Sequence, residues 1–218
     1  ADGAAPSNYL YGRNWVVQDV AFVGRMDRPD GDAKLLYPAV EADDATGLME
    51  NVVATDGSAD PDGSSNRGLT WLGQNNRGRI TFRGCHFSNW ANNTLYAANS
   101  AGRIVIEDCL FENTNVGVRI GGNTVVRDCT WKQDGPVPAQ RWSGDANGRG
   151  LWINSNQYVP GEILVEGCEF IMTGSDATSA LLASNRVDRV TVRDTRIEQH
   201  NGQAAVELPG TGPLEVEQ

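Results

Sequence analysis

The side chains that most often carry out chemistry are few in this chain of 218 residues. It contains four cysteines and two histidines, which are Cys85, Cys109, Cys129, Cys168, His86 and His200. Neither histidine belongs to a nucleophile motif with a serine or a cysteine, so both are interpreted as surface residues. The cysteines lack the Cys-x-x-Cys spacing that is typical of zinc sites. We interpret them as buried, unpaired thiols that behave as small hydrophobic residues, with a metal-binding or redox stack as the alternative.

An acidic loop that begins at Asp56 offers a second kind of chemistry. The carboxylates of Asp56, Asp60 and Asp62 are hard oxygen ligands of the type that Ca²⁺ prefers, but they do not have EF-hand spacing. The loop is therefore interpreted as a solvated acidic turn, with a weak calcium site as the alternative. No other cofactor is expected.

The charge of the chain indicates which partners it can bind and in which environment it occurs. The net charge of −10 argues against nucleic acid, whose phosphates need a concentrated basic face. Of the 18 basic residues only Lys34 and Lys132 are lysines, which suits either a high-salt environment or a GC-rich coding sequence. Together these features indicate a halophile. No window approaches the roughly 18 apolar residues of a membrane span, and we expect the chain to be a fragment of a longer polypeptide.

A short pattern recurs along the whole chain and predicts the fold. Its copies are Trp15–Phe22, Gly47–Ala54, Ile80–Phe87, Ile104–Phe111, Thr124–Trp131, Ile163–Phe170, Val190–Ile197 and a partial copy from Leu214. Each copy alternates with period two, bends at an Asp, Asn or Gly, and continues as a second short strand that carries the large apolar residue. The small residue after the bend occupies a slot that we expect to stack inside one column, filled by Val20, Val52, Cys85, Cys109, Cys129, Cys168 and Thr195.

Another strand recurs between the copies, at Leu69–Leu72, Leu95–Ala98, Val118–Gly121, Leu151–Asn154 and Leu181–Ser184. Its first and third residues are expected to face inward, which makes Trp71 a core residue, as Trp131 is in its own strand. Several short strands per repeat with loose spacing are typical of a solenoid. The sequence therefore predicts an all-β, right-handed parallel β-helix of about seven to eight coils, with residues 1–218 forming one domain.

One outward column is expected to set the register of the coils. The residue before each bend alternates in sign, in the order Glu50, Arg83, Glu107, Arg127, Glu166, Arg193 and Glu217. Opposite charges on neighbouring strands stabilise the pairing and like charges destabilise it. We interpret the column as a structural ladder of charges.

The repeat resembles that of the pectin-lyase-like superfamily, and particularly secreted or virus-associated β-helix proteins of salt-loving archaea. The glycosidases of that superfamily carry Asn-Thr-Asp, Asp-Asp, Gly-His-Gly and Arg-x-Lys motifs. This chain has Asp43-Asp44 but neither Gly-His-Gly nor Arg-x-Lys. The outward positions expected on the second strand are Thr70, Tyr96, Arg119, Trp152 and Leu182, which include no carboxylate for a lyase-type calcium site. No catalytic residue is therefore predicted, and enzymatic activity is left open with a preference against it.

Loop lengths place a candidate binding groove. The connections Arg25–Lys34, Thr55–Arg67 and Lys132–Arg149 are long, whereas those after Phe87 and Phe111 are short. A groove is therefore expected over the coils of Cys85 and Cys109, lined by Tyr96, Arg119, Trp152, Arg141 and Trp142.

Aromatic rings beside an arginine and several asparagines suit carbohydrate. We therefore expect a non-catalytic extracellular module of a cell-surface or virion assembly, such as a fibre, spike or adhesin, that binds a glycan or a glycosylated surface. Neighbouring subunits, including copies of the same chain, are the other expected partners. A polysaccharide lyase or glycoside hydrolase is the alternative.

Overall fold

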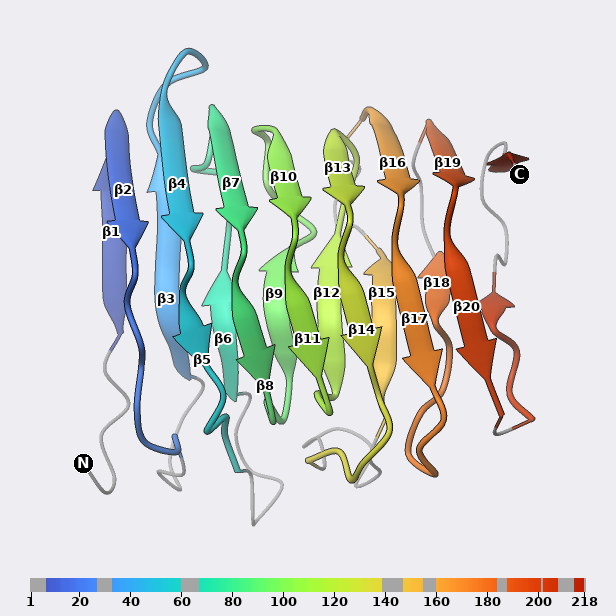
Figure 1. The fold of residues 1–218 in the computed structure, drawn as a ribbon. Helices are drawn as coiled ribbons and strands as arrows, with labels where there is room; N and C mark the ends of the chain where they lie inside the picture. The colour runs from blue at the N-terminus through green and yellow to red at the C-terminus, as the bar shows by residue number, and fades with distance from the viewer. Residues whose placement is uncertain are drawn as a thin grey trace.

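The computed structural model describes residues 7–26, 33–59, 67–138, 147–154, 160–183, 188–200, 202–207 and 214–217, the last segment by its backbone alone. Every regular element in these residues is a β-strand, and the strands form three parallel sheets that run the length of a rod (Figure 1). The strands β1 and β2 lie at one end of the rod and β22 at the other.

Successive coils add strands to the three sheets in turn, and the described residues give eight strands to each of sheets A and B and six to sheet C. Sheet A contains β1 (Asn8–Gly12), β3 (Ala33–Val40), β6 (Arg67–Trp71), β9 (Asn93–Ala97), β12 (Val116–Ile120), β15 (Arg149–Ile153), β18 (Leu181–Ala183) and β21 (Val206–Glu207). Sheet B contains β2 (Asn14–Gln18), β4 (Thr46–Glu50), β7 (Arg79–Arg83), β10 (Ile104–Glu107), β13 (Thr124–Arg127), β16 (Glu162–Glu166), β19 (Arg189–Arg193) and β22 (Leu214–Glu217). Sheet C contains β5 (Val53–Ala54), β8 (His86–Ser88), β11 (Leu110–Glu112), β14 (Thr130–Lys132), β17 (Glu169–Met172) and β20 (Arg196–Gln199).

The bend between sheets B and C has one backbone conformation in all seven copies. Its residue has a φ between 49° and 64°, in the left-handed region, and is Asp19, Asn51, Gly84, Asp108, Asp128, Gly167 or Asp194. Most residue types avoid this region, while glycine, asparagine and aspartate tolerate it. The restriction of this position to three residue types is therefore a consequence of its backbone geometry.

The column of small residues after the bend is confirmed. A main-chain N–H of each following coil donates to the carbonyl of the slot residue, as His86 N does to Val52 O and Leu110 N to Cys85 O, both at distances of 2.9 Å or less. All four cysteines are buried and unpaired. The hydrogen bond with Cys109 and burial raise the pKa of the Cys85 thiol, and burial raises that of Cys129, so both thiols are neutral. Val20 and Thr195 are only half-buried, because they belong to coils near the ends of the rod.

Beside this column, four aromatic rings stack through the core. Adjacent ring centroids from Phe87 through Phe111 and Trp131 to Phe170 lie 6.0, 5.2 and 4.5 Å apart, and all four residues are fully buried. Sheet A makes room for the largest ring with a glycine, since a Cβ atom on Gly117 would lie 2.5 Å from Trp131 Nε1. The prediction that Trp131 is a core residue is confirmed.

The prediction that Trp71 is a core residue is wrong. In the observed register Thr70 pairs with Leu95, and Trp71 pairs with Tyr96. Thr70 is buried and its hydroxyl donates to Thr94 O at 3.3 Å, whereas Trp71 is 38% exposed. The expected register was displaced by one residue, because a threonine that satisfies its hydroxyl can occupy an inward position. For the same reason Thr70 does not belong to the outward column.

The alternating charge column lies in register as predicted. Arg83 pairs in the sheet with Glu50 and Glu107, and its guanidinium lies 3.3 Å and 2.7 Å from their carboxylates. Glu166 accepts from Arg127 at 2.9 Å and from Arg193 at 2.5 Å, and the hydrogen bond from Arg127 lowers the pKa of Glu166. For Glu217 the backbone pairing with Arg193 is described. Each sign is therefore flanked by the opposite one along the ladder.

Replacing Trp131 tests the aromatic stack. We expect Trp131→Ala to lower the free energy of unfolding by about 3–5 kcal/mol, since it leaves a large cavity in a rigid column. Trp131→Phe is expected to cost much less, because a phenylalanine occupies this position in four of the other coils and the buried Trp131 Nε1 has no hydrogen-bond acceptor. Equilibrium denaturation measures both. Equal losses for the two variants would contradict the proposed packing.

Charge reversal tests the ladder. Arg127→Glu places a carboxylate between Glu107 and Glu166, so we expect a melting temperature lower by a few degrees at low salt. The loss should shrink in 1 M NaCl, where charges on the surface are screened. Arg25→Glu is the matched control, because Arg25 is exposed and outside the ladder. If the two variants melt alike at low salt, the ladder does not contribute to stability.

Candidate functional site

The outer face of sheet A carries a continuous row of aromatic side chains. The residues that follow one another in this aromatic row are Tyr9, Tyr37, Trp71, Tyr96, Arg119 and Trp152. They come from β1, β3, β6, β9, β12 and β15, so the row crosses six successive coils. At the spacing of parallel strands it extends about 24 Å along the rod.

Ring contacts link the first four members of the aromatic row. Tyr9 and Tyr37 stack with centroids 4.8 Å apart and planes 14° apart, while Trp71 is tilted by 60° to Tyr37 at 6.1 Å. Trp71 and Tyr96 are nearly parallel but displaced, with centroids 6.4 Å apart. The Trp71 ring lies over Gly73, where a Cβ atom would come within 2.6 Å of the indole Cη2. A side chain at position 73 would therefore collide with the indole.

Arginines continue the row beyond Tyr96. The guanidinium carbon of Arg119 lies 5.0 Å from the Tyr96 centroid and 4.1 Å from that of Trp152, and Arg149 approaches Trp152 at 4.9 Å. Arg119 Nη2 also donates to Asn154 Oδ1 at 2.7 Å. Burial lowers the pKa of both arginines, yet a guanidinium retains its charge in proteins. The result is a cation held between aromatic faces, an attractive arrangement.

The exposure of the row falls toward its middle. Tyr9 is 73% exposed and Trp71 38%, whereas Tyr96 is only 7% exposed. The Tyr96 hydroxyl accepts from Asn99 Nδ2 at 3.3 Å, and Asn99 Oδ1 is buried without a hydrogen-bond partner. The outward position predicted for Tyr96 was compatible with a surface role or with packing under a loop, and the buried Tyr96 fits packing. The accessible aromatic surface lies mainly on Tyr9 and Trp71, with Tyr37 and Trp152 half-buried.

Comparison with known families agrees with the three-sheet coil. The family model described as a right-handed β-helix region matches residues 45–217. The chain belongs to the right-handed β-helix family. No curated protein and no solved structure matches it. Within the described residues, no helix is long and apolar enough to span a membrane.

Three of the predicted groove residues come together in this β-helix. Tyr96, Arg119 and Trp152 lie on adjacent strands, and the connections 89–92 and 113–115 that follow β8 and β11 are short, as expected. Arg141 and Trp142 lie outside the described residues. The sequence analysis missed Tyr9, Tyr37 and Trp71. The signal for Tyr9 and Tyr37 was a tyrosine at an outward position in each of the two strands that precede Leu69–Leu72, the first copy recognised in the sequence.

The candidate acid and base groups of this β-helix have structural partners. Asp44 pairs with Arg13 at 2.7 Å and Asp43 with Arg77 at 3.1 Å, on separate partners. His86 Nε2 lies 2.6 Å from Glu112 Oε2 on sheet C, on another face from the aromatic row.

The candidate calcium loop is described at one position only. The Asp56 carboxylate accepts from Gly24 N at 2.7 Å, and Asp60 and Asp62 lie outside the described residues. The described part of the chain contains no group of three or more His, Cys, Asp or Glu residues placed to hold a metal. The calcium site stays a prediction.

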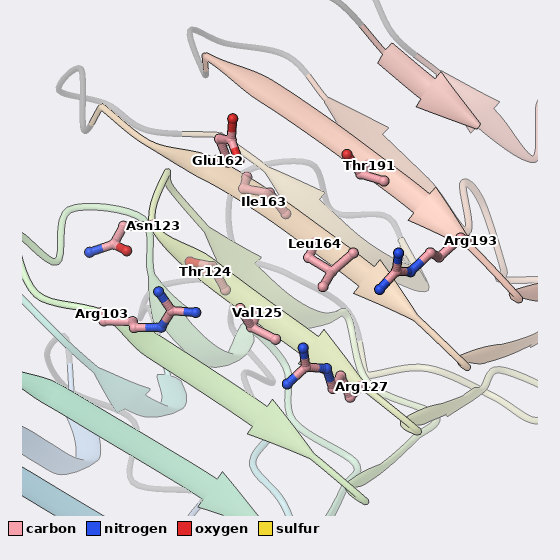
Figure 2. Close-up of a pocket in the computed structure, with 10 residues that line it drawn as sticks. All are labelled: Arg103, Asn123, Thr124, Val125, Arg127, Glu162, Ile163, Leu164, Thr191 and Arg193. Atoms are coloured by element: carbon pink, nitrogen blue, oxygen red, sulfur yellow. The ribbon is translucent and has the colours of Figure 1, made fainter. Parts of the chain in front are cut away.

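A separate hollow lies on the outer face of sheet B (Figure 2). Its volume is about 520 Å³, and Val125 and Leu164 form its apolar floor. Arg103 and Asn123 lie on one side of this floor, and Arg127 and Arg193 on the other. Both of the latter arginines form ion pairs with Glu166, at 2.9 and 2.5 Å.

Proposed function

We propose that this β-helix is a non-catalytic module that binds carbohydrate through the aromatic row of sheet A. The observation that carries the proposal is Trp71, an exposed indole that lies over Gly73 in line with Tyr37 and Tyr96. The exposed part of the indole, here called the platform, is an apolar aromatic surface of the kind on which the C–H face of a sugar ring packs.

The surroundings of the platform supply the polar part of such a site. The Asn99 amide donates to the Tyr96 hydroxyl at 3.3 Å next to the platform. Asn154 and Arg119 follow along the same face, joined by a hydrogen bond. A few fixed polar groups beside an apolar platform are typical of ligand sites. Because the row crosses six coils, it suits an extended chain of sugars better than a single ring.

The composition of the chain supports an extracellular setting for this module, on a cell surface or a virion of a halophile. A net charge of −10 with two lysines among 18 basic residues fits a high-salt medium. Salt screens attraction between charges, whereas packing of apolar surfaces persists, so aromatic stacking is the more useful source of affinity there. A glycan or glycosylated surface is the proposed partner, alongside neighbouring subunits of a fibre, spike or adhesin.

Variants at the platform test the proposal. On a glycan array followed by calorimetry, we expect Trp71→Ala to weaken the binding of the recognised glycan about tenfold, through loss of the stacking surface. Gly73→Val should weaken it comparably, because a side chain at position 73 displaces the indole. Tyr11→Ala is the matched control, since Tyr11 is 61% exposed on β1 but lies outside the aromatic row.

Three outcomes would contradict the proposal. The first is that the wild-type chain binds no glycan, and the second is that Trp71→Ala and Gly73→Val both bind as the wild type does. The third is the release of new reducing ends or unsaturated sugars in an assay of the same glycans. That release would make the chain a hydrolase or a lyase.

A further inference from the structure

The outer face of sheet B contains a second ladder that breaks the charge rule of the first. Its positions, here called the shoulder row, are Thr46, Arg79, Arg103, Asn123, Glu162 and Arg189. In the neighbouring charge column every Arg is flanked by Glu on the adjacent strands. In the shoulder row Arg79 and Arg103 stand next to each other on adjacent coils.

The two arginines are close and uncompensated. Ile80 and Ile104, which directly follow the two arginines, are paired in the sheet, and Ile80 N donates to Arg103 O at 3.0 Å. Arg79 and Arg103 are therefore one strand spacing apart. Both side chains are exposed, and neither forms an ion pair within the described residues. Like charges placed in this way destabilise a sheet.

The carboxylates near this pair have other partners. Asp44 is paired with Arg13 and Asp43 with Arg77, at 2.7 and 3.1 Å. Further along the row, Glu162 lies 3.8 Å from Arg189. The like-charge pair is therefore present in a chain that has 28 acidic and 18 basic residues and compensates its other sheet B arginines with carboxylates.

The backbone beside the pair leaves room for a ligand. Gly78 and Gly102 precede the two arginines and stack on Ala45, so closely that a Cβ atom on either glycine would collide with the carbonyl of the coil below. A hollow of about 330 Å³ lies beside them. It is lined by Thr46, Arg79, Arg103 and Asn123, and also by Arg77 and by Asp43 and Asp44, whose carboxylates are paired as described above. Arg103 and Asn123 also border the hollow of Figure 2, so they stand between two open spaces.

We propose that Arg79 and Arg103, with Asn123, form a binding site for an oxyanion group, a sulfate or a carboxylate. A guanidinium offers parallel N–H donors that match two oxygens of such a group, and two guanidiniums one strand apart can hold it between them. The Asn123 amide adds a neutral donor at the edge. This site lies on a different sheet from the aromatic row and does not depend on it.

Thermal unfolding in sodium sulfate, compared with sodium chloride at equal ionic strength, tests the site. Because sulfate stabilises proteins in general, the informative quantity is the difference between variants in how far sulfate raises the melting temperature. We expect sulfate to raise the melting temperature of the wild type more than that of Arg79→Gln or Arg103→Gln. The matched control Arg25→Gln removes the same charge from an exposed arginine outside sheet B and should respond as the wild type does.

The melting temperature without sulfate distinguishes a binding arginine from one that stabilises the fold. Arg103→Gln should melt no lower than the wild type at low salt, because it relieves a like-charge pair. A lower melting temperature for this variant, or equal sulfate responses in all four proteins, would overturn the site.

Calorimetry then identifies the source of the oxyanion. The probes are inorganic sulfate, a sulfated oligosaccharide and a uronic-acid oligosaccharide, each with the wild type and Arg103→Gln. We expect the dissociation constant of at least one probe to rise about tenfold in the variant. Tight binding of inorganic sulfate identifies a free anion, whereas tighter binding of either oligosaccharide identifies a group carried on a glycan. Binding that is unchanged in Arg103→Gln for every probe contradicts the proposal.

Discussion

The structure depends on the main-chain hydrogen bonds that hold one coil in register on the next. In parallel sheets the spacing of neighbouring strands is fixed near 4.8 Å, so equivalent residues of successive coils become contact neighbours. The left-handed bend at Asp19, Asn51, Gly84 and their equivalents keeps this register at the corner between sheets B and C. Coils of different length can then stack without loss of register, because their extra residues lie in the connections.

Register converts a sequence pattern into rows of side chains, and each row has its own physical requirement. The inner rows are small thiols and large aromatic rings, which fill a narrow core without cavities. The outer charge column alternates in sign, because every carboxylate must lie beside an arginine. The aromatic row and the Arg79–Arg103 pair do not serve the stacking of coils in these ways. Both are therefore the places where we propose that ligands bind.

The sequence was sufficient for the rows that a local marker identifies. A bend residue precedes every slot residue, so the positions of Cys85 or Glu107 within their coils followed from counting. Sheet A has no such marker, and Leu69-Thr-Trp-Leu72 permits two registers that differ by one residue. Burial of the Thr70 hydroxyl against Thr94 O decides between them, and that contact lies 24 residues away in the chain. The outward position of Trp71, and the aromatic row with it, therefore required the structure.

Nuclear magnetic resonance of the indole N–H groups tests the central claim most directly, because the described tryptophans range from the exposed Trp71 to the fully buried Trp131. When an oligosaccharide that the protein binds is titrated in, we expect chemical-shift changes for the indole N–H signals of Trp71 and Trp152. The signals of Trp90, which donates to Ala54 O at 3.1 Å, and of the buried Trp131 should stay unchanged and exchange slowly with solvent. A Trp71 indole that is protected from solvent, or one that does not respond while ligand binds, would contradict the account.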